Sequence, residues 1–114
     1  MIKKSFRIDE VAELLSLSKR SIYRHIRNGI IPVISGASRV PVIWVNNIMN
    51  GKMEAVLNGQ DRLMTIPEVF GFLNVSLSTI HGWIDEGTLD AVKVGKRKMV
   101  FKSDVIGFVK PVYE

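Results

Sequence analysis

The sequence repeats itself with a period of 58 residues, and this repeat constrains the fold more than any other feature. When the chain is shifted by 58 positions without a gap, apolar residues and residues that cap or end helices fall on each other. The matching residues of the first copy are Ile8, Glu10, Val11, Leu15, Ser18, Ile22, Ile26, Gly29, Arg39, Val42 and Ile48. Self-similarity at a fixed spacing indicates a duplicated structural unit. We therefore expect two small units, residues 1–57 and 63–114, joined by a short linker at 58–62.

Each copy begins with the signals of a short helix. The apolar spacing predicts helices at about 9–15 and 67–73. Thr65 and Glu68 fit a capping box at the start of the second of these helices, whereas Asp9 is the expected cap of the first. The positions expected to be buried are Val11, Leu14 and Leu15 in the first copy and Val69, Phe72 and Leu73 in the second.

A tight turn and a second helix follow in both copies. Leu17 and Val75 stand in the middle of the turns SLS and NVS, where an apolar side chain is expected to enter the core. Ser18 and Ser76 are N-cap residues by type, and the glycines eleven residues later are typical of the position just after a helix. We expect the second helices to end at Gly29 and Gly87.

The remaining part of each copy predicts a β-hairpin and a last helix. Residues 31–44 and 89–101 are rich in β-branched side chains around a glycine-containing turn, and Pro41 favours an edge strand. The last helices are expected to begin near Asn46 and Ser103, the first with Ile48, Met49, Met53 and Val56 on one face. Helix–turn–helix, hairpin and helix is the winged helix-turn-helix order. The fold class is therefore mainly α with small β-hairpins (α+β), in two tandem units.

The basic residues are concentrated in the first copy. Residues 1–57 contain nine basic and four acidic side chains, whereas residues 58–114 contain seven of each, so that the whole excess charge of +5 lies in the first half. Such an asymmetry indicates a nucleic-acid surface in that half.

Arg20, Arg24 and Arg27 fall on one side of the second helix, opposite Ile22 and Ile26, when residues are placed at about 100° each. A ridge of guanidinium groups fits the major groove, where arginine bonds to guanine or to phosphates. The alternative is a solvated basic face without a partner. The candidate DNA-binding residues of the first unit are Ser18, Lys19, Arg20, Ser21, Tyr23, Arg24, Arg27 and, in the hairpin, Arg39, which alternatively covers the hairpin surface only.

The second copy lacks this ridge, since Ser78, Gly82 and Asp85 occupy its three positions. Its positive charge lies in the hairpin instead. Gly82 either permits a close approach by another element or reflects drift, Asp85 either accepts a bond from cytosine or faces solvent or a lysine, and Trp83 is expected to pack in the core. The candidate DNA-binding residues of the second unit are Ser76, Ser78, Thr79, His81, Lys96, Arg97 and Lys98.

Both copies resemble the excisionase-type, MerR-like winged helix-turn-helix family. The stretches that carry the resemblance are RIDEVAELLSLSKRSIYRHIRNGIIPVI and TIPEVFGFLNVSLSTIHGWIDEGTLDAVKVGKRKMVF. The resemblance implies sequence-specific binding to double-stranded DNA, with the second helix in the major groove and the hairpin wing on the adjacent minor groove. It also implies a recombination directionality factor or a small transcriptional regulator. Gly82 departs from the family pattern, which has an arginine there.

Other functions are less well supported by the sequence. Without cysteine, a histidine–carboxylate pair or a phosphate-binding glycine loop, we expect no enzyme, no metal, no cofactor and no small-molecule ligand. No segment predicts a membrane span or a signal peptide, so a cytoplasmic protein of a bacterial, phage or mobile-element type is expected. The short linker favours a direct-repeat or asymmetric DNA site. The alternative is an adaptor whose second unit recruits an integrase, a polymerase or another copy while the first unit binds DNA.

Overall fold

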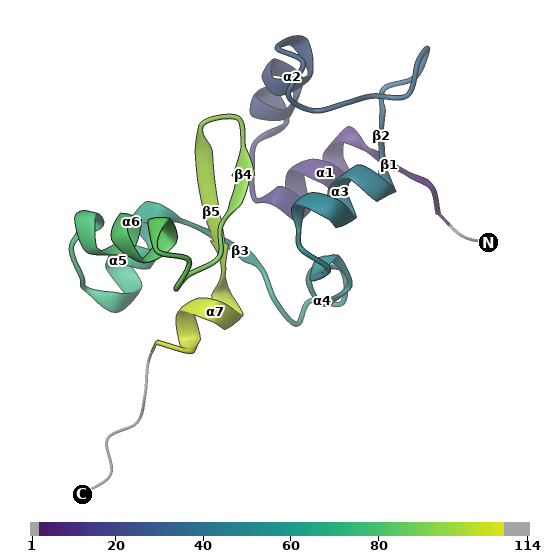
Figure 1. The fold of residues 1–114 in the computed structure, drawn as a ribbon. Helices are drawn as coiled ribbons and strands as arrows, with labels where there is room; N and C mark the ends of the chain where they lie inside the picture. The colour runs from purple at the N-terminus through teal and green to yellow at the C-terminus, as the bar shows by residue number, and fades with distance from the viewer. Residues whose placement is uncertain (1–2, 109–114) are drawn as a thin grey trace, which may run out of the picture.

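The computed structural model describes residues 3–108 of the chain. Two successive groups of short helices and strands form the molecule (Figure 1). The first group consists of β1 (Ser5–Arg7), α1 (Ile8–Leu15), α2 (Lys19–Arg27), β2 (Arg39–Pro41), α3 (Val42–Ile48) and α4 (Met53–Leu57). The second group consists of β3 (Leu63–Thr65), α5 (Ile66–Leu73), α6 (Leu77–Asp85), β4 (Val92–Val94), β5 (Arg97–Phe101) and α7 (Lys102–Ile106). These groups confirm the predicted fold class with its two helix-turn-helix segments.

The helix–turn–helix geometry forms as the capping signals predict. Ser16 and Asn74 both adopt a left-handed conformation with φ of 55° and end α1 and α5. Ser18 then accepts a hydrogen bond from the backbone N–H of Ser21 at 3.1 Å, and Ser76 accepts one from Thr79 at 3.2 Å. These side chains satisfy N–H groups that a helix start leaves without a partner.

Both second helices end where the glycines predict. Gly29 and Gly87 follow the last residues of α2 and α6 and have φ angles of +74° and +80°. Only glycine adopts this conformation without a steric cost, which explains the residue type at both positions.

The starts of the first helices differ in their caps. Thr65 and Glu68 form the predicted capping box, with 3.0 Å from the Thr65 N–H to Oε1 of Glu68 and 3.3 Å from the Glu68 N–H to Oγ1 of Thr65. Asp9 does not cap α1, since it lies inside the helix and pairs with the guanidinium of Arg7. Glu10 serves there instead, by accepting a hydrogen bond from the Arg7 N–H at 2.9 Å.

The hairpin expected at residues 31–44 is not a hairpin. Residues 32–38 form turns, and β2 pairs with β1, so that Phe6 stands opposite Val40. Pro32 cannot donate a ladder hydrogen bond, and only the Ile34 N–H reaches across to the carbonyl of Arg39. Pro41 does lie on an edge strand, because the sheet of β1 and β2 has only two strands.

The second group does form a hairpin. Strands β4 and β5 pair antiparallel around a turn at Gly95, and β3 pairs with the other side of β5. This hairpin is two residues longer than the corresponding part of the first group. The buried residues Ile31 and Leu89 differ by 58 positions, whereas the buried strand residues Val40 and Val100 differ by 60.

The expected ungapped repeat is therefore wrong beyond the second helix. Arg39 corresponds in the sheet to Met99 and not to Arg97, since Arg39 pairs with Arg7 and Met99 with Thr65. Val45 likewise corresponds to Val105, and both are fully buried. The match of Arg39 with Arg97 in the sequence has no structural counterpart.

The last helix of the first group begins earlier than expected and is broken. Helix α3 starts at Val42, directly after the strand, and Asn46 lies inside it. Asn50 and Gly51 have φ angles of +53° and +81°, which interrupts the helix before α4 begins. The four apolar residues expected on one helix face are thus divided between two helices. Helix α7 begins within one residue of the predicted Ser103.

Phe72 is 50% exposed, although it was expected in the core. Its counterpart in the first group, Leu14, is buried because α4 packs against α1. The described part of the second group ends at Phe108, before any helix equivalent to α4.

One hydrophobic cluster crosses the predicted boundary at 58–62. Core residues of the first group, such as Leu15, Ile22 and Met49, belong to the same cluster as residues of the second group. The contributing residues of the second group are Leu63, Val92, Val94, Met99 and Phe101. A second cluster, around Val69, Ile80 and Val105, lies entirely in the second group. The division into two units at 58–62 stays a prediction.

Candidate nucleic-acid interface

Helix α2 presents its arginines to solvent. Arg20, Arg24 and Arg27 are all exposed, while Ile22 is fully buried on the opposite side of the helix. The wheel drawn from the sequence therefore gives the orientation that the structure has. Three guanidinium groups project from one helix of about 10 Å diameter, which is the size that the major groove admits.

Lys19 and these three arginines form no ion pair with any carboxylate of residues 3–108. The nearby acids of α1 are engaged elsewhere, since Asp9 pairs with Arg7 and Glu10 pairs with Lys3. These contacts with basic side chains lower the pKa of both carboxyl groups, mainly through the hydrogen bonds from Arg7 and Lys3 respectively. The positive charge of α2 is thus not neutralised within the described chain.

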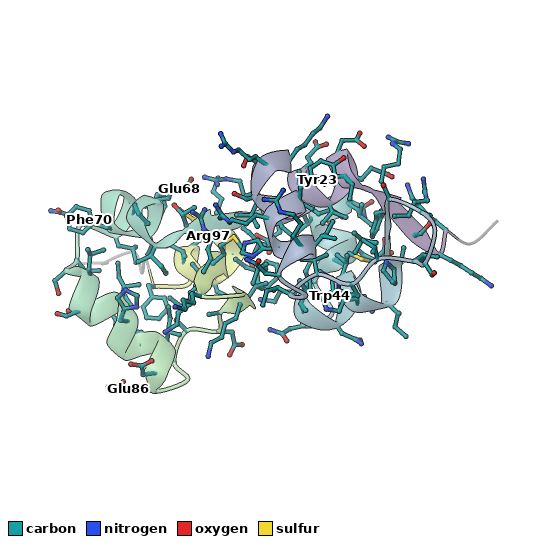
Figure 2. All side chains as sticks on the ribbon, turned by 90° about the horizontal axis from the view of Figure 1, so that it is seen from above. Tyr23, Trp44, Glu68, Phe70, Glu86 and Arg97 are labelled. Carbon is teal, nitrogen blue, oxygen red and sulfur yellow. The ribbon has the colours of Figure 1, made fainter. Side chains whose placement is uncertain are left out.

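The polar residues at the start of α2 are partly occupied. The Ser18 hydroxyl accepts the capping hydrogen bond and donates to Oγ of Ser21 at 3.1 Å. Tyr23 is exposed on the same helix, 47% of its surface being accessible (Figure 2). Arg39 is fixed at the sheet, where Nε donates to Oγ of Ser5 at 2.7 Å and Nη2 to its carbonyl oxygen at 3.1 Å.

The hairpin of the second group carries an exposed cationic tip. Lys96 and Arg97 are exposed, whereas Lys98 is half-buried and lies 3.9 Å from Oδ1 of Asp85. Asp85 therefore faces a lysine, as one of the two sequence interpretations expects. A hollow of about 490 Å³ separates the hairpin from α5 and α6. It is lined by Thr65, Ile66, Pro67, His81, Lys96, Arg97 and Lys98.

Helix α6 offers small polar groups instead of charges. The Ser76 hydroxyl lies 2.7 Å from Oγ1 of Thr79 and 3.3 Å from Oγ of Ser78, so these three side chains bond to each other. A Cβ added at Gly82 would meet no atom of the described chain within 4 Å. No element of residues 3–108 therefore makes the close approach that Gly82 was considered to permit. Trp83 packs as expected, stacked on Phe108 with 4.4 Å between the ring centroids.

His25 has a place that sequence reasoning missed. The side chain is buried on α2, and neither ring nitrogen has a hydrogen-bond partner in the described chain. Gly95 lies directly on the imidazole, since a Cβ there would be 3.3 Å from Cε1 of His25. Burial lowers the pKa of His25, and the charges of Arg24 and Arg97 lower it further. No local signal reveals this contact, because the two residues are 70 positions apart.

The fold, the uncompensated arginines of α2 and the cationic hairpin tip together define a helix-turn-helix DNA-binding protein. A model of the helix-turn-helix domain family matches residues 5–42 and again residues 63–110, which is well over half of the chain. The chain belongs to this family, which is excisionase-like and whose members bind DNA. No curated protein and no solved structure gave a significant match to the chain.

Two further properties of residues 3–108 bear on the site. No three histidine or carboxylate side chains gather there as a set that a metal ion needs. None of the helices in this part of the chain has the length and apolar character required to cross a bilayer.

Proposed function

We propose that the protein recognises a specific double-stranded DNA sequence by placing α2 in the major groove. In this role Arg20, Arg24 and Arg27 contact base edges or phosphates, and Lys19, Ser18, Ser21 and Tyr23 contact the backbone. The biological role is that of a recombination directionality factor or a small transcriptional regulator, as the excisionase-like family suggests.

The observation that carries this proposal is the set of unpaired cations on α2. Each charge that is neutralised by a phosphate releases condensed counterions, so an exposed and unpaired cationic ridge gains affinity for DNA. Arg39, in contrast, is held by Ser5, and its share in DNA binding is expected to be small.

The second group contributes through its hairpin and the start of α6. Lys96 and Arg97 are free to approach phosphates, and Ser76, Ser78, Thr79 and His81 are exposed beside them. Lys98 adds a weaker charge because Asp85 lies near it.

The test compares Arg24→Ala with Arg7→Ala in titrations of duplex DNA at a fixed, moderate salt concentration. Both substitutions remove one positive charge, but Arg7 is already paired with Asp9. Arg24→Ala is expected to weaken binding by about 1–3 kcal/mol, and Arg7→Ala much less. Equal affinities of the two variants for a selected site would contradict the placement of α2 in the groove.

A second candidate function is that of an adaptor that binds another protein through the second group. The observation that favours it is the exposure of Phe70, Phe72 and Leu77, each between 45% and 50% accessible, on α5 and α6. Exposed aromatic side chains are enriched at protein–protein interfaces. Association without DNA, measured by light scattering, tests this function.

A further inference from the structure

The hairpin β4–β5 belongs to the second group by sequence, but one of its faces is packed on the first group. Val92, Val94 and Met99 are buried in the cluster that contains Leu15 and Ile22. Figure 1 shows the hairpin standing beside α2, between the first group and the α5–α6 pair. Its position is therefore fixed by the core of the first group.

The tip of the hairpin meets α2 at one defined contact. Gly95, with φ of +61°, lies against Cε1 and Nδ1 of His25, and Ile30 flanks the same spot. A side chain on residue 95 would push the two elements apart, because the backbone is already at contact distance. The glycine is thus needed both for the turn and for the close approach.

The charges of the two elements are adjacent as a result. Arg24 of α2 and Arg97 of β5 both act on the imidazole of His25. Seen from above, Arg97 projects from the hairpin close to α2 (Figure 2). The first group has no stranded hairpin of its own, since residues 32–38 form turns.

We propose that α2 and the tip of the β4–β5 hairpin form one composite DNA-binding surface. The second group supplies the wing for the helix of the first group, and His25 and Gly95 are positioning residues that set the distance between the two. This inference rests on the proposed function, namely that α2 binds DNA. It also accounts for the uneven charges, because the cations of both groups then lie on the same surface while α6 carries none.

The composite surface makes a prediction about the length of DNA that is bound. If the two groups bound DNA independently, a duplex of about one helical turn (~10–12 base pairs) would accommodate α2 only. On the composite surface, such a duplex touches α2 and the hairpin tip at once. Arg97 then contributes even on the short duplex.

The experiment measures binding of the full chain and its variants to a mixed-sequence duplex of about 12 base pairs at low salt. Arg24→Ala is expected to weaken binding about 5- to 150-fold. Arg97→Ala is expected to weaken it measurably and to reduce the log–log salt slope by about 1. Arg7→Ala is the charge-matched control. If Arg24→Ala weakens binding and Arg97→Ala equals the control, the composite surface is wrong and the proposed function stands. If both equal the control, both proposals fail.

The role of the joint is tested with Gly95→Ala and the matched control Gly59→Ala. Both glycines have positive φ, +61° and +73°, but a Cβ at Gly59 meets nothing within 4 Å. Gly95→Ala is expected to weaken binding of the short duplex and to diminish the additional effect of Arg97→Ala, while Gly59→Ala changes neither. Identical DNA binding of both glycine variants, at equal melting temperatures, would show that the joint does not position the wing.

Discussion

The ammonium group of Lys52 lies 2.8 Å from Oδ1 of Asp104, and it also lies 4.8 Å from the centroid of the Phe101 ring. Lys52 precedes α4 in the first group, whereas Asp104 is on α7 in the second. This pair therefore links the two groups on the side away from the hairpin tip. Together with the shared hydrophobic cluster, it indicates that the groups are energetically dependent on each other.

Lys52→Ala is expected to lower the free energy of unfolding by about 1 kcal/mol. Both partners are about one third exposed, so the ion pair itself contributes only a few tenths of a kcal/mol up to about 1. The cation over the Phe101 ring adds a similar amount. A double-mutant cycle with Asp104→Ala, measured by denaturant unfolding, gives the coupling. Lys4→Ala, an exposed lysine of the N-terminal segment, is the control.

A fragment of residues 1–62 is not expected to fold on its own. It lacks Val92, Val94, Met99 and Phe101, and each buried apolar side chain of this size contributes about 1.5–3 kcal/mol. Their joint loss is comparable with the whole stability of a small domain, about 5–15 kcal/mol. Circular dichroism during heating measures this. A cooperative melt of the fragment near the temperature of the full chain would show that the cluster is dispensable.

The stability of the protein is expected to fall as the pH drops below about 6.5, because of His25. Burial, with Arg24 and Arg97 nearby, lowers its pKa in the folded state below the ordinary value of 6.5. The unfolded chain then binds the proton more readily than the folded chain, so protonation favours unfolding. The stability is complete above the unfolded pKa and is lost progressively as the pH falls toward the folded pKa.

Urea unfolding between pH 7.5 and 5.5 measures this effect, and the slope is at most about 1.4 kcal/mol per pH unit. His25→Leu removes the titrating group and is expected to abolish most of the slope. His81→Leu, which replaces the exposed histidine of α6, is expected to retain it. The opposite pattern would assign the pH dependence to another group.

Lys96→Ala is expected to reduce the slope of log affinity against log salt concentration by about 1, because one phosphate contact is lost. The affinity should fall similarly for all DNA sequences, since phosphate contacts carry no sequence information. Lys102→Ala is the control, because α7 lies at the other end of the molecule from α2 (Figure 1). An unchanged slope for Lys96→Ala would remove the hairpin tip from the interface.

Phe72→Ser is expected to leave DNA affinity unchanged and to weaken any association of the protein in solution. The side chain is half exposed on α5, so its replacement costs little core packing. Ile43→Ser is the matched control, since Ile43 is 71% exposed in the first group. If light scattering shows the same mass for all three proteins at high concentration, the adaptor function would need a different partner or a different surface.

Local signals predicted the helices well. The caps at Ser18 and Ser76, the glycine ends at Gly29 and Gly87 and the capping box at Thr65 lie within a few residues of the backbone groups that they satisfy. Their effect therefore depends on the adjacent sequence. The exposed side of α2 followed from the same local periodicity, since Ile22 must face the core wherever that core lies.

Other features depended on contacts between distant residues. Phe72 and Leu14 occupy equivalent places on their helices, but α4 covers only Leu14, and no pattern around Phe72 reveals that difference. The assignment of Arg97 as the partner of Arg39 also failed, because two additional residues in the second hairpin move the strand pairing relative to the sequence repeat.

The sequence by itself determined two helix-turn-helix segments and the arginine ridge on α2, because helix formation, capping and amphipathic periodicity act over a few neighbouring residues. Only the tertiary structure decided that the β4–β5 hairpin packs against the first group and that Gly95 rests on His25. Burial of Val92, Val94 and Met99 drives that packing, and the hydrophobic effect that favours burial has no direction encoded in the chain. Which surface receives these side chains is settled only when both groups are folded together.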